Sequence, residues 1–305
     1  MKRQLLGVAA FMLALSAHAQ DNPLWMRYCA ISPDGTSIAF TYKGDIYTVP
    51  VNGGKAAQIT TNAAHDTHPV WSPDGKQIAF ASDRMGSMDI FVVDREGGIP
   101  KRLTTHSGNE TPVAFKDADH ILFLANVMPS AEDAQFPSGQ FQQVYEVSTT
   151  GDRPVMFSSM PMEDISINKT GNALLYHDKK GYEDPWRKHH TSSITRDIWL
   201  CSLDGKRSYR KLTSFNGEDR TPVWASDGKS FYYLSEEKGS FNVFKRALDG
   251  TTSTQLTHHT KHPVRFLTAA DNGTLCYGYD GEIYTMKEGT EPRKVQISIL
   301  SLIHI

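Results

Sequence analysis

A short pattern of apolar and polar positions recurs along the chain: an apolar strand, a tight polar turn, and a second apolar strand. The turn Pro33-Asp34-Gly35 stands between Ile31 and Ile38-Ala39-Phe40, and it returns as Pro73-Asp74-Gly75 and, less closely, as Ser226-Asp227-Gly228. Proline favours the first corner of such a turn, aspartate can bond its own backbone, and glycine accepts the left-handed corner. The repeat therefore predicts β-hairpins spaced by about 40 to 45 residues.

Two further strand-like runs follow each hairpin, so each repeat supplies four strands. The third strands are Asp45-Ile46-Tyr47, Asp89-Ile90-Phe91, Val144-Tyr145, Asp197-Ile198-Trp199, Val243-Phe244 and Glu282-Ile283-Tyr284. The sets lie at about 28–60, 65–104, 110–157, 163–213, 218–257 and 262–297. We predict an all-β fold, a six-bladed β-propeller of four-stranded antiparallel blades over residues 20–299.

The two ends of the chain differ from this pattern. Lys2 and Arg3 precede an apolar run over 5–15, and Ala17-His18-Ala19 offers small residues for cleavage, which predicts a signal peptide over 1–19. The run is short for a bilayer, so we expect a soluble periplasmic protein without membrane insertion. Residues 300–305 match the translation of a common sequencing adaptor, and we expect them to be a non-native tail of a truncated gene.

Composition narrows the classes of partner and of covalent chemistry. The chain has 305 residues and a formal net charge of −2, which suits one large domain and provides no basic field for nucleic acid. Its three cysteines, Cys29, Cys201 and Cys276, lie in separate strand-like runs, so buried free thiols are expected. Cys29 and Cys276 fall in the first and last blades, so a single disulfide bond between them is left as an alternative. If blade six supplies all four of its strands, ring closure depends on apolar packing between these blades.

Polar clusters precede the innermost strands and are the first candidates for a binding site. They comprise Asp66, His68, Glu110, Glu163, Asp164, Glu218, Asp219, Arg220, His262 and Arg265. We expect them to surround one mouth of the central channel, where a mostly acidic ring would favour cationic peptide segments. The alternative is that these side chains cap the junctions between blades.

Two long loops are expected on the same face, over 126–142 and 177–196. The second contains Tyr182, Trp186, Arg187 and His189, a mixture that suits docking of a peptide or a neighbouring domain. Equally, Trp186 can cover a hydrophobic edge.

The sequence offers little for catalysis. It contains no Gly-x-Ser-x-Gly elbow, no cysteine in a Cys-His peptidase setting and no glycine-rich phosphate loop. The pairs His189-His190 and His258-His259 fall in loops, where no helix fixes metal-ligand geometry. We therefore expect no catalytic residue, metal or cofactor in this chain.

The Pro-Asp-Gly repeats resemble those of tricorn-type proteases and of the translocation protein TolB. TolB-like chains carry an α/β domain before the propeller, whereas here the strand pattern begins at about Trp25. The stretches 181–186 and 195–199 are similar to the corresponding loop and strand of the six-bladed tricorn propeller. The overall resemblance is to exported tricorn-like serine peptidases of Bacteroides-type bacteria.

That resemblance implies a supporting role in proteolysis. In the family the six-bladed propeller precedes a second propeller, a PDZ domain and a tail-specific-type protease core, which holds the catalytic residues. This chain would then be a noncatalytic channel or filter for peptides or unfolded segments, with the downstream protease domains as partners and a possible homo-oligomer. Two alternatives stay open: a stand-alone TolB-like envelope scaffold, and the propeller of a prolyl-oligopeptidase-like exopeptidase.

Overall fold

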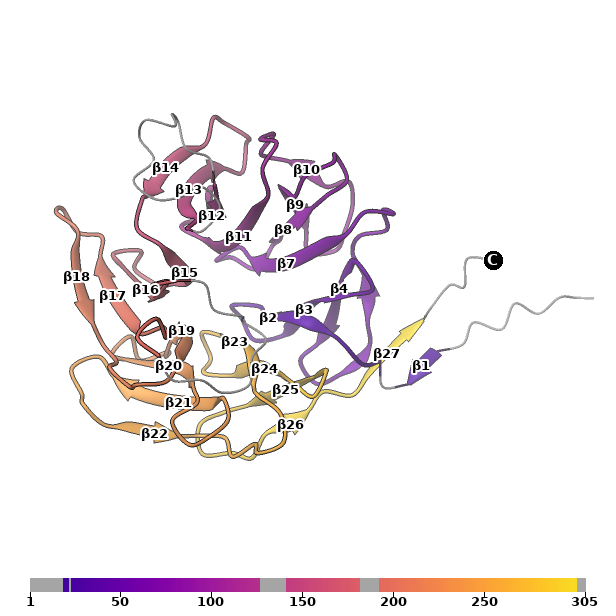
Figure 1. Ribbon diagram of the computed structural model, residues 1–305. Helices are drawn as coiled ribbons and strands as arrows, with labels where there is room; N and C mark the ends of the chain where they lie inside the picture. Colours follow the sequence, from indigo (N-terminus) through magenta and orange to yellow (C-terminus); the bar gives the residue numbers. More distant parts are fainter. Residues whose placement is uncertain (1–18, 22, 127–140, 182–191, 301–305) are drawn as a thin grey trace, which may run out of the picture.

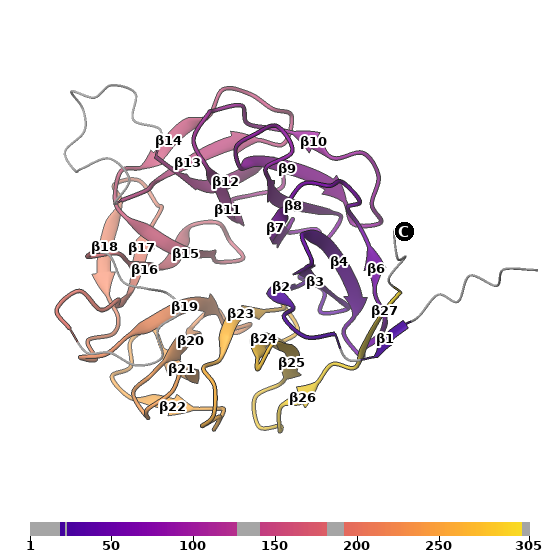
Figure 2. The ribbon, with the colours of Figure 1, turned by 45° about the vertical axis from the view of Figure 1, so that its right-hand side comes forward.

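The computed structural model describes residues 19–21, 23–126, 141–181 and 192–300. Within these ranges six four-stranded antiparallel sheets surround a central opening (Figures 1 and 2), which confirms the predicted six-bladed propeller. In every sheet the strand order follows the sequence from the centre outward.

The first three blades are β2 (Arg27–Ile31), β3 (Ser37–Tyr42), β4 (Asp45–Pro50) and β6 (Ala57–Gln58); β7 (Asp66–Trp71), β8 (Gln77–Ser82), β9 (Asp89–Asp94) and β10 (Lys101–Arg102); and β11 (Glu110–Phe115), β12 (His120–Ala125), β13 (Gln143–Ser148) and β14 (Val155–Ser158). The last three are β15 (Met162–Ile167), β16 (Ala173–Asp178), β17 (Ile198–Ser202) and β18 (Ser208–Lys211); β19 (Asp219–Trp224), β20 (Ser230–Ser235), β21 (Asn242–Ala247) and β22 (Ser253–Gln255); and β23 (Arg265–Ala269), β24 (Leu275–Tyr279), β25 (Glu282–Met286) and β26 (Arg293–Lys294).

The recurring turn is held by its own side chains. Asp34 accepts hydrogen bonds from the Ser32 hydroxyl at 2.6 Å and from the Thr36 amide at 3.0 Å, and these bonds lower the pKa of the carboxyl. Gly35 has a φ of 73°, the left-handed value that the turn requires. The turn chemistry therefore sets the pairing of each first and second strand.

The tryptophan that precedes some of these turns connects neighbouring blades. The indole N–H of Trp71 donates to the carbonyl oxygen of Ala30 at 2.9 Å, and that of Trp224 donates to Ser166 at the same distance. Each bond joins the innermost strands of two consecutive blades.

A threonine near the end of the fourth strand fixes the start of the third. The Oγ1 atoms of these threonines accept a hydrogen bond from the first apolar residue of the third strand, each at 2.9 Å. The pairs are Thr60 with Ile46, Thr104 with Ile90, Thr213 with Ile198, and Thr257 with Val243.

The ring is closed in two ways. Blades one and six share a hydrophobic cluster that contains Cys29, Phe40, Cys276 and Ile283. In addition, β27 (Ile297–Leu300), which contributes Ile297 and Ile299 to this cluster, leaves blade six and runs parallel to β5 (Gly54–Lys55), and antiparallel to β1 (Ala19–Asp21). Closure therefore combines apolar packing with backbone hydrogen bonds. All three cysteines are buried and unbridged.

Candidate functional site

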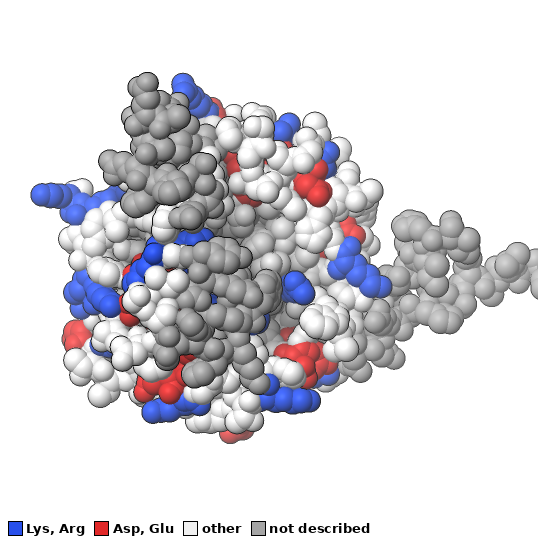
Figure 3. Space-filling view, in the orientation of Figure 1, with Lys and Arg blue, Asp and Glu red and all other residues white. Residues whose placement is uncertain are grey.

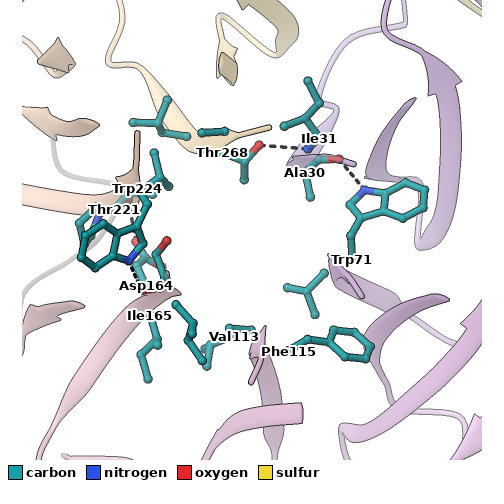
Figure 4. A pocket seen from close by; sticks show the side chains of 18 of the residues that line it. Ala30, Ile31, Trp71, Val113, Phe115, Asp164, Ile165, Thr221, Trp224 and Thr268 are labelled. Carbon is teal, nitrogen blue, oxygen red and sulfur yellow. Dashed lines mark hydrogen bonds between the residues drawn. The ribbon is translucent and has the colours of Figure 1, made fainter. Parts of the chain in front are cut away.

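The centre of the ring holds a cavity of about 1040 Å³. Its wall is formed by the six innermost strands, β2, β7, β11, β15, β19 and β23. Figure 4 shows labelled side chains around an open centre, with Trp71 and Trp224 on opposite sides. Because the backbone of these strands is already paired within each blade, the wall is rigid and side chains decide what can enter.

Every innermost strand contains a register shift: it begins at the residue named below in five blades, and in β11 it falls one residue later, just after Pro112, which stands at the equivalent distance from its turn. We name these six residues the bulge ring. Its members are Tyr28, His68, Pro112, Asp164, Thr221 and Phe266. All except proline have a left-handed φ, between 48° and 58°, and all six line the cavity. Bulges redirect side chains, and non-glycine residues with positive φ are uncommon. Their recurrence in five blades marks a repeated feature of the channel wall.

One half of the bulge ring is aromatic. The Tyr28 and His68 rings lie with centroids 3.7 Å apart, and Tyr28 and Phe266 are 4.9 Å apart. Burial lowers the pKa of His68 to about 4, so its imidazole is neutral at physiological pH. Beneath Phe266, a Cβ on Gly278 would stand 2.9 Å from the phenyl ring, so only glycine leaves room for it.

The other half consists of Pro112 and two polar residues, Asp164 and Thr221, of which Asp164 is an acid. Asp164 accepts a hydrogen bond from the Thr221 hydroxyl at 2.6 Å, and its side chain is 48% exposed. His177 lies beside this pair, with its Nδ1 atom 3.6 Å from the Asp164 carboxylate. The same Nδ1 atom accepts a hydrogen bond from the backbone amide of Thr221. Asp164 is thus a solvent-accessible carboxylate inside the channel.

A buried ion network supports this polar half. Glu163 is bound by Lys179 at 2.8 Å, His177 at 3.2 Å and Arg196 at 3.3 Å. Burial opposes its ionisation, but the hydrogen bond from His177 and the surrounding positive charges hold its pKa below the usual range.

The network continues into blade five. Arg196 and Arg220 both bind Glu218, at 2.5 and 2.6 Å. Their charges are therefore largely compensated within the wall.

At the mouth of the cavity on the side of the Pro-Asp-Gly turns, an exposed salt bridge joins two blades. Lys169 of blade four and Asp271 of blade six are joined at 2.9 Å, although blade five stands between them in the ring. Figure 3 shows basic and acidic side chains interspersed over the visible described surface, without a field of a single sign. Exposed pairs of this kind add little stability, so the contact can open readily.

Four of the predicted acids lie at blade junctions and not at the mouth, which corrects the expectation of a mostly acidic ring. Asp66, Glu110, Glu218 and Asp219 are each at most 2% exposed. Arg84 binds both oxygens of Asp66, and Thr104 donates to Glu110. Glu110 and Glu218 meet residues of the preceding blade, Thr104 and Arg196, whereas Asp66 is enclosed with Arg84 of its own blade. Among the predicted acids, only Glu163 and Asp164 line the cavity.

The other predicted site residues lie in different places. His68, Arg220 and Arg265 line the cavity, whereas His262 pairs with Asp280 at 3.2 Å. Tyr182, Trp186, Arg187 and His189 lie outside the described residues, as do 127–140 of the other long loop. Among described residues, no group of three or more metal-binding side chains occurs, and no helix has the length and hydrophobicity to cross a membrane.

Sequence reasoning missed several cavity residues: Tyr28, Pro112, His177, Arg196, Thr221 and Phe266. A signal was present for four of them. Each bulge-ring residue lies five positions before the second residue of its blade's turn, these being Pro33, Pro73, Asp117, Lys169, Ser226 and Asp271. Alignment of the six blades on their turns would have placed the ring.

Comparison with known proteins decides the family. Residues 23–292 match the tricorn protease N-terminal beta propeller domain. The chain belongs to this family. Tricorn protease homolog 1 of Streptomyces coelicolor is 25% identical over 281 residues, covering 91% of this chain and 25% of the relative. The tricorn protease of Thermoplasma acidophilum is 24% identical over 289 residues, covering 91% and 26%.

Solved structures agree on the fold. The crystal structure of the tricorn protease superposes with a TM-score of 0.74 at 20% identity, over 90% of this chain and 26% of that one. TolB from Acinetobacter baumannii gives 0.62 at 15% identity, over 89% and 64%. This tricorn-family chain spans about a quarter of the length of the tricorn relatives named here.

Proposed function

We propose that this propeller is a noncatalytic channel that admits extended peptides to, or releases them from, the protease core of a tricorn-like serine protease. The observation that carries the proposal is the cavity walled by six paired strands and lined by the bulge ring. Membership of the tricorn propeller family supports the link to protease domains.

The size of the cavity fits such a passenger. An extended residue fills about 160 Å³, from a rise of about 3.3 Å, a strand spacing of about 4.8 Å and a sheet spacing of about 10 Å. A volume of about 1040 Å³ thus holds about six extended residues. A folded domain is far too large to enter, so passage would be restricted to unfolded chains.

The test uses a variant that fills the channel. Val113 lines the cavity on blade three (Figure 4), and Val113→Trp adds bulk there. Val155, on the exposed outer strand β14, provides the matched control Val155→Trp. The purified chain should bind reduced, carbamidomethylated lysozyme, which is unfolded, and should ignore native lysozyme.

Anisotropy of the fluorescein-labelled probe measures this binding. Val113→Trp should weaken it by about tenfold or more, because the added indole occupies the space of the peptide, while Val155→Trp should leave it unchanged. Equal binding by both variants would contradict the proposal. So would turnover of denatured casein that survives removal of contaminating proteases, since the chain is proposed to lack catalytic groups.

Export to the periplasm is part of the same proposal. It rests on the Lys2-Arg3 start and the apolar run over 5–15, which lie outside the described residues. Residues 1–22 fused to alkaline phosphatase should give activity in the periplasm of a two-membrane host. Leu13→Arg should abolish this activity and Gln4→Arg should not; cytoplasmic retention of the unaltered fusion would refute export.

A further inference from the structure

The bulge ring presents two chemically different sides to one point of the channel. Tyr28, His68 and Phe266 come from blades one, two and six, which are neighbours once the ring is closed. Asp164 and Thr221 come from blades four and five, across the opening. A chain that passes this point meets aromatic rings on one side and an accessible carboxylate on the other.

We propose that the bulge ring selects extended peptides in which an aromatic or large apolar residue is adjacent to a lysine or arginine. This inference rests on the proposed function. Adjacent side chains of an extended chain point in opposite directions. One residue can therefore pack on Tyr28 and Phe266 while its neighbour reaches Asp164.

The charges around Asp164 favour a cation as its partner. Thr221 is a neutral donor, while Arg196 and Arg220 are bound to Glu163 and Glu218. A lysine or arginine would form a charge-assisted hydrogen bond with this accessible carboxylate. A glutamate at the same point would instead be repelled by the carboxylate.

The aromatic side adds a preference of its own. The Tyr28 ring makes tilted contacts with His68 and Phe266, and the three rings form a surface that a further ring or long aliphatic side chain extends. His68 stays neutral near pH 7, so it adds no repulsion toward a basic residue. The ligand class is therefore a mixed apolar and basic segment.

Three fluorescein-labelled dodecapeptides of glycine and serine test this selection by anisotropy. They carry Phe-Lys pairs, Phe-Glu pairs or Ser-Lys pairs. The full chain should bind the Phe-Lys peptide about tenfold more tightly than either of the others.

Variants assign the preference to the ring. Asp164→Asn should reduce the preference for Phe-Lys over Phe-Glu to within about threefold. The double change Tyr28→Asn and Phe266→Asn should remove the preference for Phe-Lys over Ser-Lys. Asparagine is chosen because it tolerates the left-handed φ at all three positions. Circular dichroism of each variant checks that it is folded. Asp117→Asn, which removes a carboxylate at the other end of the cavity, is the matched control and should change neither ratio.

The outcomes separate this inference from the proposed function. Equal binding of all three peptides by the unaltered chain would overturn the selection and leave the channel intact. A preference that survives Asp164→Asn would likewise overturn it. If none of the peptides and no unfolded protein binds, the proposed function fails, and this inference with it.

Discussion

At the scale of single residues, the acids enclosed between blades are the groups through which pH acts on this fold. Glu110 accepts a hydrogen bond from Thr104 and is 1% exposed, and burial raises its pKa to about 7. Asp219 is in the same situation, with a pKa also raised to about 7 by burial. Both carboxyl groups therefore keep their protons to a higher pH in the folded chain than in the unfolded chain.

Glu110→Gln is expected to change how stability depends on pH. Since the folded pKa of about 7 exceeds the unfolded value of about 4.5, the folded state holds an extra proton between them. The stability from this group is complete below about pH 4.5 and is lost as pH rises toward 7. Urea unfolding should show the variant more stable at pH 8 by about 1 to 3 kcal/mol and nearly equal at pH 4.5. Glu96→Gln, at an exposed site, is the control, and a constant offset across pH would contradict the assignment.

The cysteines give a second expectation at this scale. Burial raises the pKa of the Cys201 and Cys276 thiols, and all three side chains are at most 2% exposed. Ellman's reagent at pH 8 should therefore detect almost no thiol in the folded chain and three after unfolding in guanidinium. Detection of only one after unfolding would show that Cys29 and Cys276 are bridged.

At the scale of strands and turns, indole hydrogen bonds between blades carry a measurable part of the stability. Trp71→Phe removes the donor to the buried Ala30 carbonyl, which should cost about 1 to 3 kcal/mol in the free energy of unfolding. Trp199 is the control, because its indole donates to a partly exposed carboxylate of Asp178 that also has Lys180 nearby. Trp199→Phe should cost less than half as much; equal losses would mean that ring volume, not the hydrogen bond, is responsible.

The turns and strands also show which parts of the fold could be predicted from the sequence. The hairpins were predictable because Pro33, Asp34 and Gly35 determine their turn locally, through side-chain and backbone bonds within five residues. The backbone conformation of the bulge ring was not, because Tyr28 and Phe266 have no intrinsic preference for a left-handed φ. Their conformation is imposed by the neighbouring strands of the ring.

The burial of the acids at the junctions between blades could not be predicted from the sequence, for a related reason. Asp66 and Asp164 occupy similar clusters before an inner strand, yet one is enclosed with Arg84 and the other is open to the channel. The difference is the side of the strand that each faces, and the bulge sets that side. Their places relative to the turn differ, since Asp164 is five positions before Lys169 and Asp66 is seven positions before Pro73, but the meaning of that difference depends on the bulge, which the sequence did not predict.

At the scale of the whole molecule, the contribution of the two closing contacts can be separated at Gly53. It has a φ of 89°, and a Cβ there would lie 2.5 Å from the Gln296 carbonyl oxygen. Gly53→Ala should therefore displace β27 and break the bonds from the Gly54 amide to Gln296 and from the Ala56 amide to Ser298. Gly97 is a matched control, with the same φ of 89° and its nearest atom at 3.5 Å.

Hydrogen exchange then shows which contact keeps the ring shut. Both glycine variants bear the cost of a left-handed alanine, about 1 kcal/mol, but only Gly53→Ala should speed exchange at Gly54 and Ala56. The Met26 amide, which bonds to Gly281 across the inner seam, should stay protected, because β27 contributes only Ile297 and Ile299 to the cluster of blades one and six, and its other members, among them Cys29 and Cys276, stay in place. Loss of protection at Met26 in Gly53→Ala, but not in Gly97→Ala, would mean that β27 holds the propeller closed and that apolar packing alone does not.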